Sequence, residues 1–267
     1  MAINEHIHPY KGKHSVKEAV ISFYVQPNEI EPEAFRKLLT EEGPVRNFYQ
    51  KFETIKEISV DVSLGKDTKV NRVQDAGFKY TGFKEGRTSK VIQCINQPMQ
   101  TIFTFNELEY VSWKEYLPIS MEVAKQIANM LPGNKLTAFN LLYIDEFYFD
   151  EGVSYNAEDL FNLDSRTLPK GLLDSPLVDY HLVLSKEVES QGYTDSLNIK
   201  VLDANKCKTI RIINSLTYPL AKRVSWLDYL ENEEVVILLN HAHGSNKQIL
   251  NDILNKDIAK EIGVCVC

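Results

Sequence analysis

Alternating apolar and polar residues predict strands along much of the chain. The run Ile58–Leu64 alternates in this way, as a half-buried strand requires. Further strands are predicted at 19–25, 77–83, 90–96 and 101–110, and short clusters of turn-forming residues separate the last three. Because such short connections form hairpins, we expect these three strands to be antiparallel neighbours.

A capped helix and a long strand follow. Ser112 is predicted to cap the helix, and Glu115 has the spacing of its partner in a capping box. Pro132-Gly133 is expected to end the helix, and residues 136–149 then have the pattern of a strand. The apolar face of the helix comprises Val123, Ile127, Met130 and Leu131.

The second half of the chain shows a similar order of elements. Strands are predicted at 178–188, 197–202, 209–215 and 234–239, followed by a helix over 246–262. Residues 150–178 are rich in turn formers and contain one predicted short helix, Ala157 to Phe161.

This order predicts an α+β protein made of two antiparallel-sheet halves, each with a long helix packed on one face. The boundary is expected after residue 152, so the N-terminal half comprises residues 1–152 and the C-terminal half comprises residues 153–267. An internal duplication is a hypothesis that rests on element order alone, since the halves share no residue-level similarity.

Composition indicates a soluble globular protein. Of the 267 residues, 43% are hydrophobic and 25% charged, and the net charge is −7. An acidic balance argues against a broad surface for nucleic acid. No apolar run is long enough for a membrane helix, and the N-terminus lacks the apolar core of a secretory signal, so we expect a cytoplasmic protein.

The four cysteines agree with a reducing compartment. Cys94 and Cys207 lie in strand-like runs, whereas Cys265 and Cys267 are separated by a single residue. That spacing is too tight for a structural zinc pair, so free thiols are the leading interpretation and a metal or redox pair is the alternative.

Three segments resemble a family of uncharacterised bacterial proteins of about this length, which are distributed sporadically among genomes. The segments are Tyr10-Lys11 with Val16–Val20, then Phe103 and Phe105 with Tyr110 and Ser112-Trp113, and finally Phe139–Asp145. The chain departs from the family pattern at Leu142, where Arg is common, and at Asp145, where Asn is common. The resemblance implies an association with mobile-element or defence gene cassettes, and it implies no chemistry.

The pair His241 and His243 is the first candidate for chemistry. On a strand, residues two apart point to one face, which is a usable metal-ligand geometry. The pair falls at a predicted strand-to-helix turn, where Gly244 and Ser245 suit a turn and an N-cap. We therefore expect no metal site. If the chain did bind a metal ion, His241 and His243 would be the candidate ligands.

Carboxylates and aromatic residues supply the other candidates. Asp145 and Glu146, together with Glu107 and Glu109, are either exposed strand-end charges or ligands for a metal-dependent nuclease. The aromatic residues around the central helix either form a core or line a groove between sheet and helix. The candidate binding residues are Phe103, Phe105, Tyr110, Trp113, Tyr143 and Asp145.

Phosphate-binding loops and nucleophile elbows are missing from the sequence, so no cofactor is expected. The leading hypothesis is a non-enzymatic cytoplasmic protein that binds or regulates a partner protein encoded by a neighbouring gene. A metal-dependent nuclease or phosphodiesterase that uses Asp145 is the alternative. A small-molecule sensor with an aromatic cleft is the third possibility.

Overall fold

A computed structural model describes residues 6–11, 14–26, 30–61, 69–150, 152, 156–170, 180–188, 192–204, 207–261 and 264. The helices are α1 (Pro32–Phe35), the 3₁₀ helix η2 (Arg36–Leu39), α2 (Pro44–Phe48), α3 (Trp113–Asn129), α4 (Ala157–Leu160), α6 (Trp226–Glu231), α7 (Glu233–Ile253) and α8 (Lys256–Glu261). The strands are β1 (Ile7–Pro9), β2 (Val16–Val25), β3 (Lys51–Asp61), β4 (Lys69–Lys84), β5 (Arg87–Gln97), β6 (Gln100–Glu107), β7 (Lys135–Phe149), β8 (Tyr180–Val188), β9 (Tyr193–Ala204) and β10 (Cys207–Ser225).

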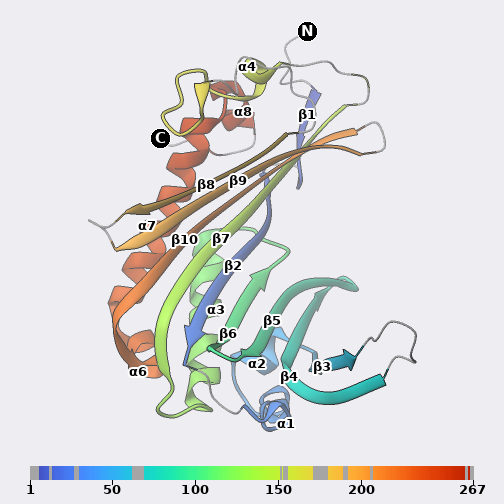
Figure 1. Cartoon of the computed structure of the whole chain (residues 1–267), viewed down its shortest axis with the longest axis vertical. Coiled ribbons are helices and arrows are strands. Elements are labelled where there is room, and N and C mark those ends of the chain that lie inside the picture. Colours follow the sequence, from blue (N-terminus) through green and yellow to red (C-terminus); the bar gives the residue numbers. More distant parts are fainter. Residues whose placement is uncertain are drawn as a thin grey trace. The chain divides into compact units, whose positions relative to one another are not determined.

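Hydrogen bonds join the described strands in the order β3-β4-β5-β6-β2-β7-β10-β9-β8, and β1 pairs with β7 beside this path. The pairs β3–β4, β4–β5, β5–β6, β8–β9, β9–β10 and β1–β7 are antiparallel. This large antiparallel sheet confirms the α+β class (Figure 1). The internal duplication remains a prediction.

The chain packs into two compact units that are interleaved along the sequence. Unit 1 comprises Met1–Ala19, Asn140–Tyr218 and Val236–Cys267, and unit 2 comprises Val20–Phe139 and Pro219–Val235. Residues on both sides of the boundary expected after residue 152 therefore belong to unit 1.

The core of unit 1 lies between α7 and one face of its strands (Figure 1). Apolar residues of β9 and β10 alternate along each strand and pack with Leu250 and Ile253 of α7. The buried strand residues of this core are Ile7, Phe147, Phe149, Leu197, Ile199, Val201, Ile210 and Ile212.

Aromatic residues dominate the core of unit 2. Phe103 on β6 lies between Trp226 and Phe78, with ring centroids 4.6 Å and 6.3 Å away. Phe23 on β2 packs with both Phe105 and Trp226. Such pairs add about 0.5–1.5 kcal/mol each to the free energy gained by burying the rings.

Helix α3 forms as its sequence predicts. The Ser112 hydroxyl accepts a hydrogen bond from the Glu115 backbone N–H at 3.3 Å, and Val123 and Ile127 are buried. Gly133 follows the helix with φ at 85°, a left-handed conformation that suits glycine. Both predicted ends of this helix are confirmed.

The strand predicted at 234–239 is wrong, because these residues form the start of α7. The run EVVILL is short and apolar, so its periodicity is compatible with either element. Val235 and Leu239 are buried whereas Ile237 is 63% exposed, which is the spacing of one helical face. The helix predicted over 246–262 thus begins earlier, at Glu233, and divides into α7 and α8.

Among the described residues, no helix is both long enough and apolar enough to cross a bilayer.

Candidate functional site

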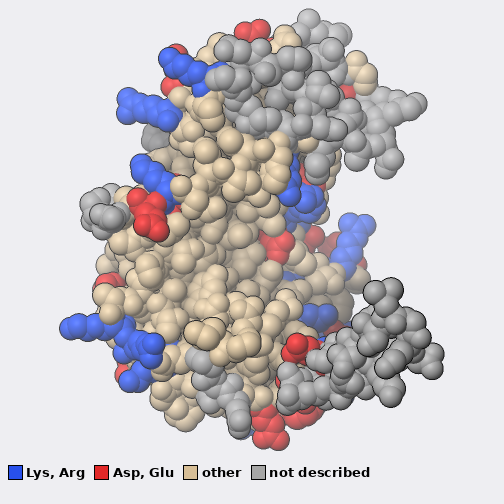
Figure 2. Space-filling view, viewed as in Figure 1, with Lys and Arg blue, Asp and Glu red and all other residues tan. Residues whose placement is uncertain are grey.

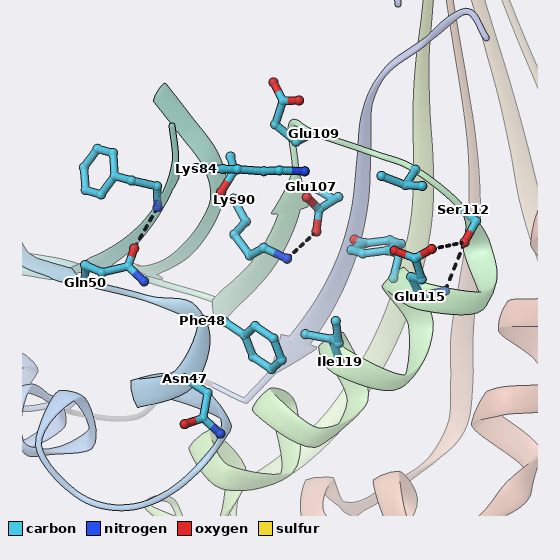
Figure 3. Close-up of a pocket in the computed structure, with 14 residues that line it drawn as sticks. Asn47, Phe48, Gln50, Lys84, Lys90, Glu107, Glu109, Ser112, Glu115 and Ile119 are labelled. Atoms are coloured by element: carbon cyan, nitrogen blue, oxygen red, sulfur yellow. Dashed lines mark hydrogen bonds and ion pairs between the residues drawn. The ribbon is translucent and has the colours of Figure 1, made fainter. Parts of the chain in front are cut away.

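Unit 2 contains a pocket with a volume of about 260 Å³ (Figure 3). Its walls come from α2, the hairpin of β4 and β5, the end of β6 and the first turns of α3. The lining residues are Asn47, Phe48, Gln50, Phe83, Lys84, Ser89, Lys90, Glu107, Glu109, Val111, Ser112, Glu115, Tyr116 and Ile119.

An ion pair between Lys90 and Glu107 forms part of the pocket lining. The Lys90 Nζ donates to Glu107 Oε2 at 2.9 Å, and Figure 3 shows the two groups meeting within the pocket. The Lys90 Nζ also lies 5.3 Å from the centre of the Phe48 ring, a cation–π distance. This lysine therefore has two partners inside the protein.

The strand register explains why this pair forms. Along β6, buried and half-buried residues alternate, and Glu107 occupies the last buried position after Thr101, Phe103 and Phe105. Lys90 lies directly opposite Glu107 in the antiparallel ladder between β5 and β6. Opposite charges at facing positions stabilise a sheet and compensate a carboxylate that strand alternation turns inward.

The ion pair with Lys90 uses one of the two carboxylate oxygens of Glu107. The residue is 8% exposed, and its Oε1 has no hydrogen-bond partner within the described residues. Oε1 keeps some contact with solvent, and Glu107 lines the pocket, so a ligand in the pocket can approach this oxygen. An accessible, unpartnered carboxylate oxygen can accept a hydrogen bond from a ligand.

Buried tyrosines adjoin the carboxylate. The Tyr116 hydroxyl donates to the Phe105 carbonyl and accepts from the Ile21 backbone N–H at 2.8 Å. Burial raises the pKa of Tyr116 and of Tyr49, and the negative charge of Glu107 raises both further. These phenols therefore stay neutral and act as fixed structural groups.

The rim of the pocket is apolar in two places. Phe83 is 42% exposed and Val111 is 59% exposed, although large apolar side chains are more often buried. The Gln50 side chain accepts a hydrogen bond from the Phe83 backbone N–H at 2.7 Å, which fixes the strand next to the rim. Val111 immediately precedes Ser112, the N-cap of α3, so the helix start determines where Val111 lies.

The aromatic residues predicted as a groove lie mainly inside unit 2. Phe103 and Phe105 are fully buried, Tyr110 is buried, and Trp113 is half-buried. Tyr110 and Trp113 both pack on the ring of Tyr116. None of these four residues lines the pocket, but Tyr116 does. Through their contacts with Tyr116, Tyr110 and Trp113 lie next to the pocket wall.

Tyr143 and Asp145, the other two predicted binding residues, belong to unit 1. The Tyr143 hydroxyl is 2.9 Å from Nδ1 of His243, and the two rings are in contact, so Tyr143 packs against α7. Asp145 is fully buried and accepts a hydrogen bond from Ser15 at 2.6 Å.

The predicted setting of the histidine pair is wrong. His241 and His243 lie within α7, where residues two apart point to different sides of the helix. His241 Nδ1 is 2.7 Å from the Tyr218 hydroxyl, whereas His243 contacts Tyr143. Burial, assisted by the charge of Lys247, lowers the pKa of His243 to about 4. Gly244 and Ser245 are helical rather than turn and capping residues.

None of the four carboxylates is an exposed strand-end charge, because three are buried and Glu109 is half-buried. Asp145, Glu146 and Glu107 are buried. Lys90 pairs with Glu107, whereas Asp145 has a hydrogen bond from Ser15 and its Oδ2 has no partner among the described residues. Glu146 accepts hydrogen bonds from Lys17 and Arg211 in unit 1. Where the structure describes residues, it contains no cluster of three His, Cys, Asp or Glu that could hold a metal ion. Cys265 and Cys267 lie outside the described residues, and Cys94 is a buried free thiol.

Sequence reasoning missed most of the pocket. Its residues lie far apart in the chain, and only the packing of unit 2 brings Phe48, Phe83 and Val111 together. The one available signal was Glu107, an acidic residue at a position where strand alternation predicts an apolar one.

Fold and site together define an α+β protein with a large antiparallel sheet and a charged, partly apolar pocket. Comparison of the chain with protein-family models, curated proteins and solved structures finds no match in any of the three.

Proposed function

We propose that this chain is a non-enzymatic protein that binds a short segment of a partner protein at the unit 2 pocket. The observation that carries the proposal is the rim, where Phe83 and Val111 expose apolar surface beside an accessible cavity. Exposed apolar groups that surround a pocket are typical of protein-binding sites.

The polar groups of the pocket suit binding better than catalysis. Lys90 pairs with Glu107, Ser112 caps α3, and Gln50 holds the backbone of Phe83. Burial raises the pKa of Tyr116, the tyrosine in the pocket lining, so its phenol does not give up a proton near neutral pH.

Charge supports a protein partner over nucleic acid. The net charge is −7, and on the face shown in Figure 2 Lys and Arg are interspersed with Asp and Glu rather than gathered in one patch. Phosphate-backbone recognition requires a concentrated basic surface. In keeping with the resemblance described above, we propose a cytoplasmic protein whose partner is encoded by a neighbouring gene in a mobile-element or defence cassette.

A displayed library of random peptides tests binding at the pocket even though the partner is unidentified. Peptides selected on the purified wild-type protein are expected to lose at least about tenfold in affinity for Phe83→Asp, because a charge on the rim opposes apolar contact. Met99→Asp is the matched control, since Met99 is an 84% exposed apolar residue of unit 2 that does not line the pocket. The proposal fails if no peptide is enriched, or if the enriched peptides bind Phe83→Asp and wild type equally.

A further inference from the structure

The charges of the pocket favour one kind of occupant. Three glutamates and two lysines line it, and Lys90 is already committed to Glu107 and to the Phe48 ring. The accessible Oε1 of Glu107 belongs to a residue that is only 8% exposed, and it lacks a donor within the described residues. An incoming donor, rather than an acceptor, satisfies this oxygen.

The apolar lining matches the stem of a long basic side chain. Phe48 and Ile119 are half-buried and contribute side chains to the pocket. Lysine and arginine carry three or four methylene groups that pack on such surfaces while the charged head reaches a polar group.

We infer that the pocket accepts a lysine or arginine side chain of the partner segment, and that its charged group donates to Glu107 Oε1. The inference rests on the proposed function and specifies its ligand. Phe83 and Val111 then contact the residues that flank the basic one, and this contact favours a peptide over a free amine, which would leave the rim uncovered.

An acidic side chain is disfavoured at the same place. Of the two lysines that line the pocket, Lys90 is paired with Glu107. The carboxylates of Glu107, Glu109 and Glu115 outnumber the other lysine, Lys84, so the net charge of the lining opposes an acidic side chain. Charge-assisted hydrogen bonds are also the strongest kind, so the accessible carboxylate oxygen should dominate the selection among side chains.

The sequences selected from the peptide library give the first readout. Enrichment of one position in Lys or Arg, flanked by apolar residues, supports the inference. Enrichment that depends on Phe83 but contains no basic position overturns the inference and leaves the proposed function standing. Failure of all enrichment removes the proposed function and the inference together.

Variants of the ion pair give the second readout. For the best selected peptide, three versions are compared that carry Lys, norleucine or Glu at the basic position, with Kd measured at about pH 8 and low salt by fluorescence polarisation. On wild type, the Lys version should bind about tenfold more tightly than the norleucine version, and the Glu version more weakly than both.

The Lys90→Met variant decides the inference, because the direction in which it changes the affinity for the Lys peptide is diagnostic. It keeps an apolar stem beside Phe48 but removes the internal competitor for Glu107, so the Lys peptide should bind about tenfold more tightly while the norleucine peptide is unchanged. Glu107→Gln should abolish the preference for Lys over norleucine, and Met99→Asp should leave all three affinities as in wild type. Weaker binding of the Lys peptide to a folded Lys90→Met variant would overturn the inference, even if Glu107→Gln fails to fold.

Discussion

Asp145 and Glu146 are adjacent on β7 and both are buried, yet their pKa values shift in opposite directions. Burial raises the pKa of Asp145 to about 6, and the single hydrogen bond from Ser15 offsets this only partly. Burial also opposes ionisation of Glu146, but hydrogen bonds from Tyr148, Lys17 and Arg211 outweigh it and lower its pKa. The number of donors, not burial, therefore decides which carboxyl is a stable anion.

Asp145→Asn is expected to stabilise the protein at neutral pH. The folded pKa of about 6 lies above the ordinary value of 3.8, so Asp145 favours folding fully below about pH 4, and this contribution is lost as pH rises through 6. At about 1.4 kcal/mol for each pKa unit, Asp145 costs about 3 kcal/mol at pH 7. Urea unfolding at pH 4 and pH 7 should show a gain for Asp145→Asn that is large at pH 7 and small at pH 4.

Glu146→Gln is the matched control, with the opposite sign. Because the pKa of Glu146 is lowered, its contribution to stability is present at neutral pH and is lost as pH falls. Its replacement leaves Lys17 and Arg211 without their shared carboxylate and should cost about 3 kcal/mol at pH 7. If both substitutions shifted stability in the same direction at pH 7, the assignment of the two carboxyls would be incorrect.

At the scale of elements, α7 contains a glycine that its packing does not require. Gly244 lies in the helix interior, and an added Cβ would meet no atom within 4 Å. Gly77 on β4 differs, because its φ is 153° and a Cβ there would lie 1.9 Å from the Cys94 carbonyl oxygen. One glycine is thus replaceable, whereas the other is fixed by backbone conformation and close approach.

Gly244→Ala should therefore raise the free energy of unfolding by about 1 kcal/mol, the difference in helix propensity between the two residues. Gly77→Ala, the contrasting variant, should lower it by about 3 kcal/mol because the strand must move. Urea denaturation measures both. Destabilisation by Gly244→Ala would contradict the helical conformation of Gly244, which the sequence pattern predicted as a turn residue between a strand and a helix.

Local patterns predicted the elements that local forces determine. The cap at Ser112, the strand before it and the long strand β7 were all readable, because capping chemistry and period-two alternation specify them. The start of α7 was not readable, since Val235 and Leu239 fit either element until the sheet beneath them is known. The pocket was beyond reach for the same reason, because the meeting of Phe48 and Glu107 depends on tertiary packing alone.

At the scale of the whole molecule, neither compact unit is a continuous piece of chain. Unit 1 takes residues from the start, the middle and the end, and unit 2 takes Pro219–Val235 from the second half. Such connectivity places contacts far apart in sequence and ties the folding of each unit to a complete chain.

A fragment ending at residue 152 should consequently fail to fold by itself. Most of the described apolar cluster that packs with α7 follows this cut, and of its buried members only Ile7, Phe147 and Phe149 precede it. Unit 2 would lose Trp226, which is buried against Phe23 and Phe103, and the loss of a buried ring of this size costs about 3–5 kcal/mol. That cost is a large fraction of the free energy of unfolding of a typical domain, which is about 5–15 kcal/mol.

Two-dimensional NMR of fragment 1–152 is expected to show poorly dispersed amide signals and urea unfolding without a cooperative transition. Mixing it with fragment 153–267 should restore the dispersion, because the two pieces together contain every segment of both units. A cooperatively unfolding, well-dispersed fragment 1–152 would instead support a boundary after residue 152. Residues 1–152 would then specify a fold by themselves. The residues that the second half contributes to each core would only add stability to that fold.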